Sequence, residues 1–150
     1  MRIIIQRVSE ASVSIDQQIS GKINHGFLIL LGIVEGDDQI AIDWLAGKIV
    51  KMRIFPDDAG KMNLCIKDVD GSLLVVSQFT LHAGTKKGNR PSFIKAARPK
   101  TAIPLYEKFI TTLEKEMGKP CATGEFGADM QVSLVNDGPV TIMLDTELKE

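Results

Sequence analysis

The sequence has few of the residues that build metal sites, disulfide frameworks or membrane spans. It contains two cysteines and two histidines in 150 residues, and these form no cluster at metal-ligand spacing. We therefore predict that the protein binds no metal. The longest apolar run, GFLILLGIV at 26–34, is far shorter than the ~20 residues that span a bilayer. This run is predicted to be a buried strand.

The N-terminus also lacks the features of a signal peptide. MRIIIQRVSEASVSID leads directly into an alternating strand pattern, without an apolar h-region or a small-residue cleavage site. We expect a cytoplasmic protein whose two cysteines, Cys65 and Cys121, are reduced and structural. The content of 44% hydrophobic and 25% charged residues suits a single globular domain over residues 1–150.

Acidic residues are absent between Gly71 and Tyr106. This segment carries a charge of +6, so the remaining residues carry −7, because the whole chain carries −1. A local positive field of this kind suits a polyanionic ligand such as a phosphate backbone. The alternative is a solvated basic loop. The basic residues are Lys86, Lys87, Arg90, Lys95, Arg98 and Lys100.

Strand patterns recur along the chain without repeats or linkers. Alternation of apolar and polar residues predicts two paired strands around Ser9 and Glu10, and the last two strands are expected to form a hairpin or a tight corner around the turn NDGP. The predicted strands are residues 2–9, 11–16, 26–34, 73–81, 130–135 and 140–145.

Two segments have the periodicity of amphipathic helices. One covers residues 38–52, with Asp37 or Asp38 as its N-cap. The other covers residues 101–119 and ends at Gly118. Its buried stripe is predicted to contain Ile103, Tyr106, Phe109, Ile110, Leu113 and Met117.

The predicted strand 73–81 ends in polar side chains. Gln78, Thr80 and His82 share one face if the strand continues through them. A strand that ends this way often delivers residues to a site, although an ordinary strand can reach the surface in the same way. A Thr80 hydroxyl nucleophile would need an activating base, and His82 is the only nearby candidate in the sequence.

The closing turn NDGPVT, at 136–141, also has an unusual composition. Gly138 removes side-chain bulk where Pro139 removes a backbone N–H, so carbonyl oxygens are left as acceptors for a ligand's amino group. Spacing alone favours a trans Gly138–Pro139 bond and a structural turn. Phe126 and Met130 lie near glycines and suit either base stacking or core packing.

Several motifs together resemble the D-aminoacyl-tRNA deacylase family over essentially the whole chain. The family is typically an α/β domain of mixed, largely antiparallel β-sheets with two long helices packed on one face, and it uses no cofactor. The matching motifs are QRVSEASVSID at 6–16, RIFPDDAGKMNL at 53–64, SQFTL at 77–81, KKGNRPSF at 86–93 and FGADMQVSLVNDGPVT at 126–141.

The resemblance implies a function in translation quality control. The family hydrolyses the ester that joins a D-amino acid, or a mischarged glycine, to the 3′-terminal adenosine of tRNA. Its members are homodimers in which a cis Gly-Pro pair, here Gly138–Pro139, enters the active site of the other subunit. The two carbonyl groups hold the α-amino group and leave no room for an L side chain.

The resemblance also assigns roles to individual residues. Ser77, Gln78, Phe79 and Thr80 are expected to contact the adenosine and the oxyanion, with backbone amides near Phe79 and Thr80 stabilising the charge. The 2′-hydroxyl of the terminal ribose assists attack by water. Arg7 is expected to support the Gly-Pro pair, and Phe126 and Met130 to form the adenine pocket.

Two other functions fit parts of the sequence. A nucleic-acid-binding module without hydrolytic activity would use the basic 86–100 loop and would need no intact pocket. A general serine esterase is a poorer match, because the sequence lacks the Gly-x-Ser-x-Gly elbow and offers no convincing base for Ser77.

Overall fold

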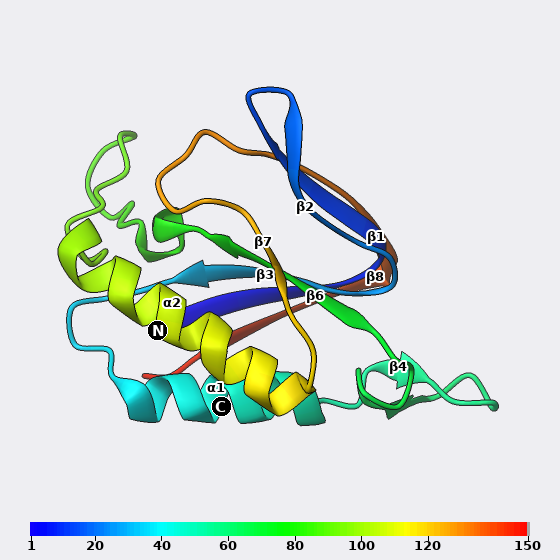
Figure 1. Cartoon of the computed structure of the whole chain (residues 1–150). Coiled ribbons are helices and arrows are strands. Elements are labelled where there is room, and N and C mark those ends of the chain that lie inside the picture. The colour runs from blue at the N-terminus through cyan, green and yellow to red at the C-terminus, as the bar shows by residue number, and fades with distance from the viewer. Residues whose placement is uncertain (150) are drawn as a thin grey trace.

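The computed structural model describes residues 1–149 and consists of one mixed sheet with two helices against it (Figure 1). The strands of this sheet follow the order β2-β1-β3-β6-β7, and β8 pairs with β1. The main strands are β1 (Arg2–Ile15), β2 (Gln18–Ile23), β3 (Gly26–Gly32), β6 (Ser72–Ser77), β7 (Ala122–Thr123) and β8 (Gln131–Asp145). The helices are α1 (Gln39–Lys51), the 3-10 helix η1 (Phe79–His82) and α2 (Pro99–Met117), and a small separate sheet contains β4 (Phe55–Pro56) and β5 (Met62–Leu64).

The sheet is largely antiparallel, as predicted. β1 runs antiparallel to β2, β3 and β8, whereas β3–β6 and β6–β7 are parallel pairs. The ends of the strand order also approach each other, because Ser20 Oγ in β2 donates to the Thr123 carbonyl oxygen in β7 at 3.1 Å. Gly21 permits this approach, since a Cβ there would lie 2.7 Å from the same oxygen. The sheet therefore curls into a near-barrel.

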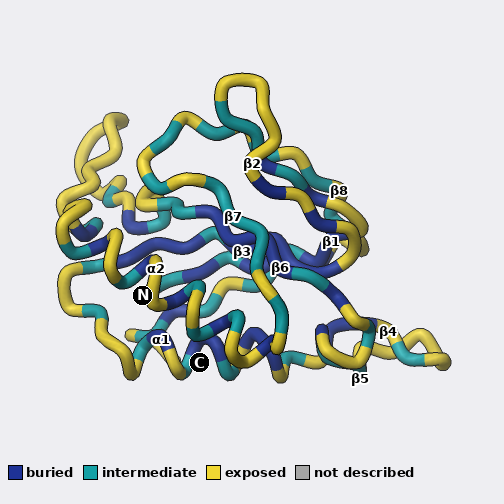
Figure 2. Tube along the Cα trace, in the orientation of Figure 1, coloured by how far each residue is buried: buried dark blue, intermediate teal, exposed yellow. Residues whose placement is uncertain are grey.

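The central strands are buried (Figure 2), and apolar side chains pack on both of their faces. One cluster lies under the helices and contains Ile29 of β3 and Phe109 of α2. The other lies inside the curl of the sheet and contains Val8, Leu28 and Val76. Because β3 has neighbours on both faces, it is buried along nearly its whole length, as its continuous apolar run predicted.

Both predicted helices are present on one face of the sheet, α1 and α2 side by side (Figure 1). α1 begins after Asp38, whose side chain accepts a hydrogen bond from the Ala41 N–H at 3.0 Å. The predicted stripe of α2 is correct at Tyr106 and Phe109 but wrong at Ile103, which is 37% exposed. Ala102, four residues before Tyr106, occupies the buried position instead.

Three strand predictions are wrong. Residues 2–15 form one strand, and its turn lies at Asp16–Gln17, both with positive φ, before a second strand, 18–23, that the apolar pattern did not indicate. Residues 131–145 also form one strand, which pairs with β1 along its length. The hairpin predicted around NDGP is therefore absent from this strand. The strand predicted at 73–81 ends at Ser77.

Neither helix is long and apolar enough to cross a membrane within residues 1–149. In the same residues no group of His, Cys, Asp and Glu side chains is arranged to hold a metal ion.

Arg2 joins the start of β1 to the end of β8 by an ion pair and to η1 by a hydrogen bond. Arg2 Nε donates to Asp145 Oδ2, and Arg2 Nη1 donates to the Leu81 carbonyl oxygen, both at 2.7 Å. Burial by itself would raise the pKa of Asp145, but hydrogen bonds from the Glu147 N–H and the Arg2 guanidinium outweigh it and lower the pKa below the ordinary value. The ionised carboxylate therefore stabilises the folded state.

We predict that Asp145→Asn lowers the free energy of unfolding by about 2 kcal/mol at pH 7, because the Arg2 guanidinium loses its charged acceptor. Since the folded-state pKa is lowered, this contribution is complete above the ordinary pKa of an aspartate and disappears as the pH falls through the folded-state value. Urea unfolding at fixed protein concentration, at neutral and acidic pH, measures both effects. Asp58→Asn, at an exposed position, is the control. A wild-type-to-variant difference that persists unchanged in acid would contradict the prediction.

Candidate active site

The motif SQFTL lies at the junction of β6 and η1. Ser77 is the last residue of β6 and lies beside Leu31 of β3. The Gln78 N–H still donates to the Leu31 carbonyl oxygen at 2.7 Å, and the chain then turns into η1. The turn occurs where β3 itself ends at Gly32, so no further strand partner is available. The motif therefore presents a strand end followed by a helical turn.

Gly32 allows η1 to lie directly on the end of β3. A Cβ at this position would lie 2.9 Å from His82 Cδ2, 3.0 Å from Leu81 Cβ and 3.1 Å from the Gln78 carbonyl oxygen. Any larger residue would push η1 away from the sheet. The sequence reasoning did not identify Gly32 as part of the site, and its position just after an apolar run was the available signal.

A small cavity brings part of the predicted site together. Ser77, Gln78 and Phe79 line it with Phe126 and Gly127, and its volume is about 60 Å³. The ring of Phe126 packs edge-on against Tyr106, with centroids 5.7 Å apart.

Met130 does not join this group. Its side chain packs against the apolar cluster inside the curl of the sheet, beside Val13 and Gly124, where a Cβ on the glycine would lie 2.4 Å from the Met130 sulfur. The structure therefore brings Phe126, but not Met130, to the SQFTL cavity.

Among residues 1–149, no general base lies beside the Thr80 hydroxyl. Thr80 is exposed, and its Oγ1 accepts a hydrogen bond from Gln78 Nε2 at 2.5 Å. An amide nitrogen cannot take up a proton from the hydroxyl. Burial, together with the nearby Cys121, raises the pKa of Tyr106 to about 12, so this phenol, which packs against Phe126, stays neutral and is not a base either.

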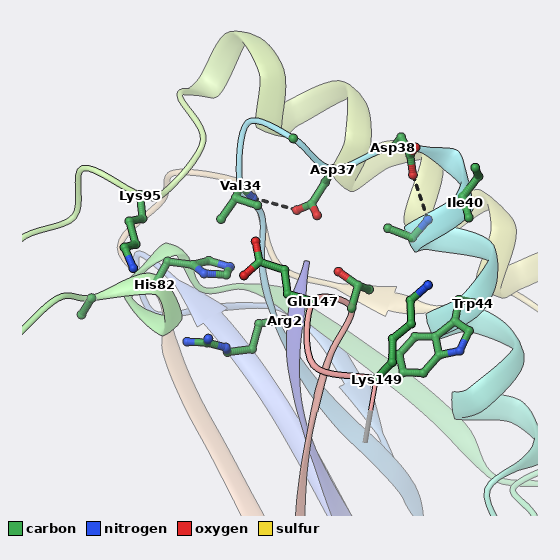
Figure 3. A pocket seen from close by; sticks show the side chains of 14 residues that line it. Arg2, Val34, Asp37, Asp38, Ile40, Trp44, His82, Lys95, Glu147 and Lys149 are labelled. Carbon is green, nitrogen blue, oxygen red and sulfur yellow. Dashed lines mark hydrogen bonds between the residues drawn. The ribbon is translucent and has the colours of Figure 1, made fainter.

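His82 points away from Thr80. Its ring is buried and lines a separate cavity of about 650 Å³ with Arg2, Lys95 and Glu147 (Figure 3). Within the described residues its Nε2 has no hydrogen-bond partner. The prediction that Thr80 and His82 share a face is wrong, because η1 has about three residues per turn and places positions two apart on different sides.

Arg7 lies against the Gly-Pro pair, in the middle of the β1–β8 pairing. The register steps from Gln6–Thr141 to Val8–Asn136, so residues 137–140 bulge out of the ladder. Arg7 is 8% exposed, and its guanidinium donates to the carbonyl oxygens of Asp137 (3.1 Å) and Ile54 (2.6 Å). The planar guanidinium group thus connects the bulge to Ile54, which lies in the segment after α1.

Asn136 closes the bulge from the other side. Its Nδ2 donates to the carbonyl oxygens of Arg7 and Val140, both at 3.0 Å. The Gly138–Pro139 peptide bond is cis, so the trans geometry expected from spacing alone is wrong. Both residues are exposed, and Gly138 has a φ of +133°. Sequence reasoning missed Asn136, although asparagine commonly bonds to nearby backbone at a turn.

Within one chain the two parts of the predicted site lie far apart. Ser77 is level with Leu31 and hence with Ile3, whereas the Gly-Pro bulge is level with Arg7. This separates them by about 13 Å along the strands and about 14 Å across them. An aminoacyl group at the SQFTL cavity therefore cannot contact Gly138 of the same chain.

Comparison with known proteins decides the family. A family model described as D-Tyr-tRNA(Tyr) deacylase matches residues 4–145. The chain belongs to this deacylase family. It is 61% identical to a protein named D-aminoacyl-tRNA deacylase from Flavobacterium johnsoniae and 59% identical to one from Bacteroides thetaiotaomicron, each over 150 residues and the full length of both chains.

Two solved structures share the fold of this chain. One, titled c-Myc DNA Unwinding Element Binding Protein, superposes with a TM-score of 0.90 at 38% identity and covers 97% of this chain and 99% of its own. Another, of a probable eukaryotic D-amino acid tRNA deacylase, superposes with a TM-score of 0.81 at 15% identity over 95% and 97% of the two chains, and it supports the fold alone. The deacylase family of this chain is a family of hydrolases that act on aminoacyl-tRNA esters.

Proposed function

We propose that this protein hydrolyses the ester between a D-amino acid and the 3′-terminal adenosine of tRNA. The observation that carries the proposal is the cavity where Ser77, Gln78 and Phe79 meet Phe126, at the start of η1. Full-length relatives at 59–61% identity bear the name of this activity. The adenine is proposed to lie at the mouth of the cavity against Phe79 and Phe126, with Met130 contributing only indirectly through the packing of the segment after Phe126.

Backbone groups are proposed to stabilise the transition state. The N–H groups of Phe79 and Thr80 open η1 and therefore have no partner inside that helix. They are suited to hydrogen bonding with the oxyanion that forms when the ester carbonyl is attacked. Because Thr80 has no base beside it, the nucleophile is proposed to be water, assisted by the ribose 2′-hydroxyl of the tRNA. No metal or cofactor takes part in this mechanism.

A second copy of the chain is proposed to complete the site. A cavity of about 60 Å³ is far below the roughly 300–1,000 Å³ of pockets that enclose a small molecule. The exposed Gly138–Pro139 pair, which cannot reach the SQFTL cavity of its own chain, can enter that of a partner. β8 is also a long edge strand that pairs only with β1 in the described chain, and Val135 and Met143 on it are half exposed. A homodimer would cover these groups.

Chirality is proposed to be read by exclusion. The carbonyl oxygens of the partner's Gly138 and Pro139 would accept hydrogen bonds from the substrate's α-amino group, and the adjoining backbone would occupy the volume into which an L side chain projects. Glycine has no side chain to exclude, so glycyl esters, including glycine mischarged on alanine tRNA, would also be cleaved. The protein would perform this editing in the cytoplasm, where aminoacyl-tRNA is used.

Single-turnover hydrolysis of D-tyrosyl-tRNA and L-tyrosyl-tRNA tests the proposal, with the oligomeric state measured on the same sample. We expect a dimer that cleaves the D ester and spares the L ester. If neither ester is cleaved while uncharged tRNA binds in a salt-dependent way, the basic segment would indicate a nucleic-acid-binding module, a function that also fits the relative titled as a DNA unwinding element binding protein.

Thr80→Ala is expected to retain D-tyrosyl-tRNA hydrolysis within about tenfold of wild type, because the side-chain hydrogen bond of its hydroxyl is to the Gln78 amide, which is not a base. Thr80→Ser, which keeps the hydroxyl, is the matched variant. A loss of roughly a thousandfold or more in Thr80→Ala, restored in Thr80→Ser, would identify the hydroxyl as the nucleophile.

Gly138→Ala is expected to reduce D-ester hydrolysis by about a hundredfold. A Cβ would lie 2.8 Å from Val140 Cγ2 and 3.1 Å from Arg7 Nη2, in a backbone conformation with φ of +133° that disfavours alanine. Gly36→Ala is the control, because a Cβ at Gly36 meets no atom within 4 Å. Wild-type rates in a folded Gly138→Ala dimer would exclude a close contact between this pair and the substrate.

A further inference from the structure

An exposed apolar surface lies beside the SQFTL cavity. Phe79 is 53% exposed, and its ring packs edge-on against that of Phe93, which is 38% exposed, with centroids 5.1 Å apart. Ile94, the next residue, is 92% exposed. Two consecutive apolar side chains that remain this exposed among the described residues are typical of a binding surface.

The basic loop, residues 84–92, precedes Phe93 directly, and a backbone bridge between its first and last residues holds it in place. The backbone of Gly84 and Ser92 forms an isolated antiparallel bridge, with hydrogen bonds of 2.7 and 2.9 Å between the two residues. The bridge returns the chain to η1, so that Phe93 follows directly at the side of Phe79. Figure 1 shows the loop standing clear of the sheet at the end where α2 begins.

The same loop supplies positive charge without a compensating acid. Lys86, Lys87 and Arg90 are exposed, and none of them forms an ion pair with another described residue. The loop lies within the segment 71–106, which contains no Asp or Glu. Exposed aromatic rings bordered by free cations are typical of surfaces that bind single-stranded nucleic acid.

We propose that Phe93 and Ile94 form a stacking surface for the nucleotide that precedes the terminal adenosine, and that the loop's cations hold the phosphates of the single-stranded tRNA 3′ end. This inference rests on the proposed function, which places the terminal adenosine against Phe79. The ring of Phe93 packs against Phe79 and directly follows the Gly84–Ser92 bridge that closes the basic loop, so the next base of the strand would meet it on the way to the loop. Stacking of this kind tolerates any base, because each has a π-face.

The test compares wild type and Phe93→Leu on three D-tyrosyl esters: those of full-length tRNA, of the trinucleotide CCA, and of adenosine alone. Leucine keeps apolar volume but removes the π-face. We expect kcat/KM to fall about tenfold on the first two substrates, mainly through a higher KM. The adenosine ester lacks the preceding nucleotide, so its hydrolysis should not change. Ile19→Ala, at an exposed position of β2, is the control.

The other outcomes overturn the inference in distinguishable ways. Equal kinetics of wild type and Phe93→Leu on all three esters would show that the base does not stack there. An equal loss on all three would show that Phe93 acts only by supporting Phe79. Dissociation of the Phe93→Leu dimer would identify Phe93 as a subunit contact. Wild-type protein that is inactive on every ester would refute the proposed function itself, and this inference with it.

A second variant tests the role of the cations. Lys87→Gln is expected to reduce the slope of log kcat/KM against log salt concentration by about one for the tRNA and CCA esters, since one phosphate contact is lost. The slope for the adenosine ester, which has no phosphate, should be near zero in both proteins. An unchanged slope in Lys87→Gln and in Lys86→Gln would overturn the phosphate contacts.

Discussion

The pairing of β1 with β8 is the constraint on which both parts of the site depend. At one end of the pairing, Arg2 joins Asp145 and the Leu81 carbonyl oxygen, which holds η1 in position. In the middle, the β1–β8 pairing is interrupted at Arg7. Residues 137–140, which include the cis peptide bond, bulge out of the sheet there. One strand therefore positions the element that is proposed to bind the ester and the element that is proposed to read chirality. Slippage of this pairing by one residue would move both at once.

This arrangement explains why one chain alone is an incomplete enzyme under the proposed function. The sheet holds η1 and the Gly-Pro bulge in fixed positions in two different regions. The two elements of one chain therefore cannot approach each other. Two copies related by a two-fold axis would bring the Gly-Pro bulge of each to the SQFTL cavity of the other, because every contact in such an interface occurs twice. Activity would then depend on protein concentration through the dimerisation equilibrium.

The sequence predicted the elements whose signals are local and failed where the deciding neighbour was distant. The 3.6-residue periodicity located both helices, and the continuous apolar run located β3. The strand predicted to 81 ends early because β3 ends at Gly32, a fact that no local pattern contains. The apparent hairpin at NDGP is a bulge in a continuous strand, since turn residues also suit bulges. The contact between Arg7 and the bulge was expected only from the family resemblance.

In the proposed mechanism, the site residues act mainly through their backbone groups. Amide N–H groups of η1 and carbonyl groups of the bulge are the proposed binding elements, and a substitution that changes only the side chain, unlike one to proline, leaves them in place. The positions of these backbone groups, however, depend on three residues. Gly32 has no side chain and so allows η1 to lie on the end of β3, whereas the side chains of Asn136 and Arg7 hold the bulge by hydrogen bonds. Selectivity in such a site follows from rigidity, because a backbone group that can retreat by an ångström no longer excludes an L side chain. Under the proposed function, the hydrogen bonds of Arg7 and Asn136 would therefore contribute to substrate discrimination as much as the atoms that touch the substrate.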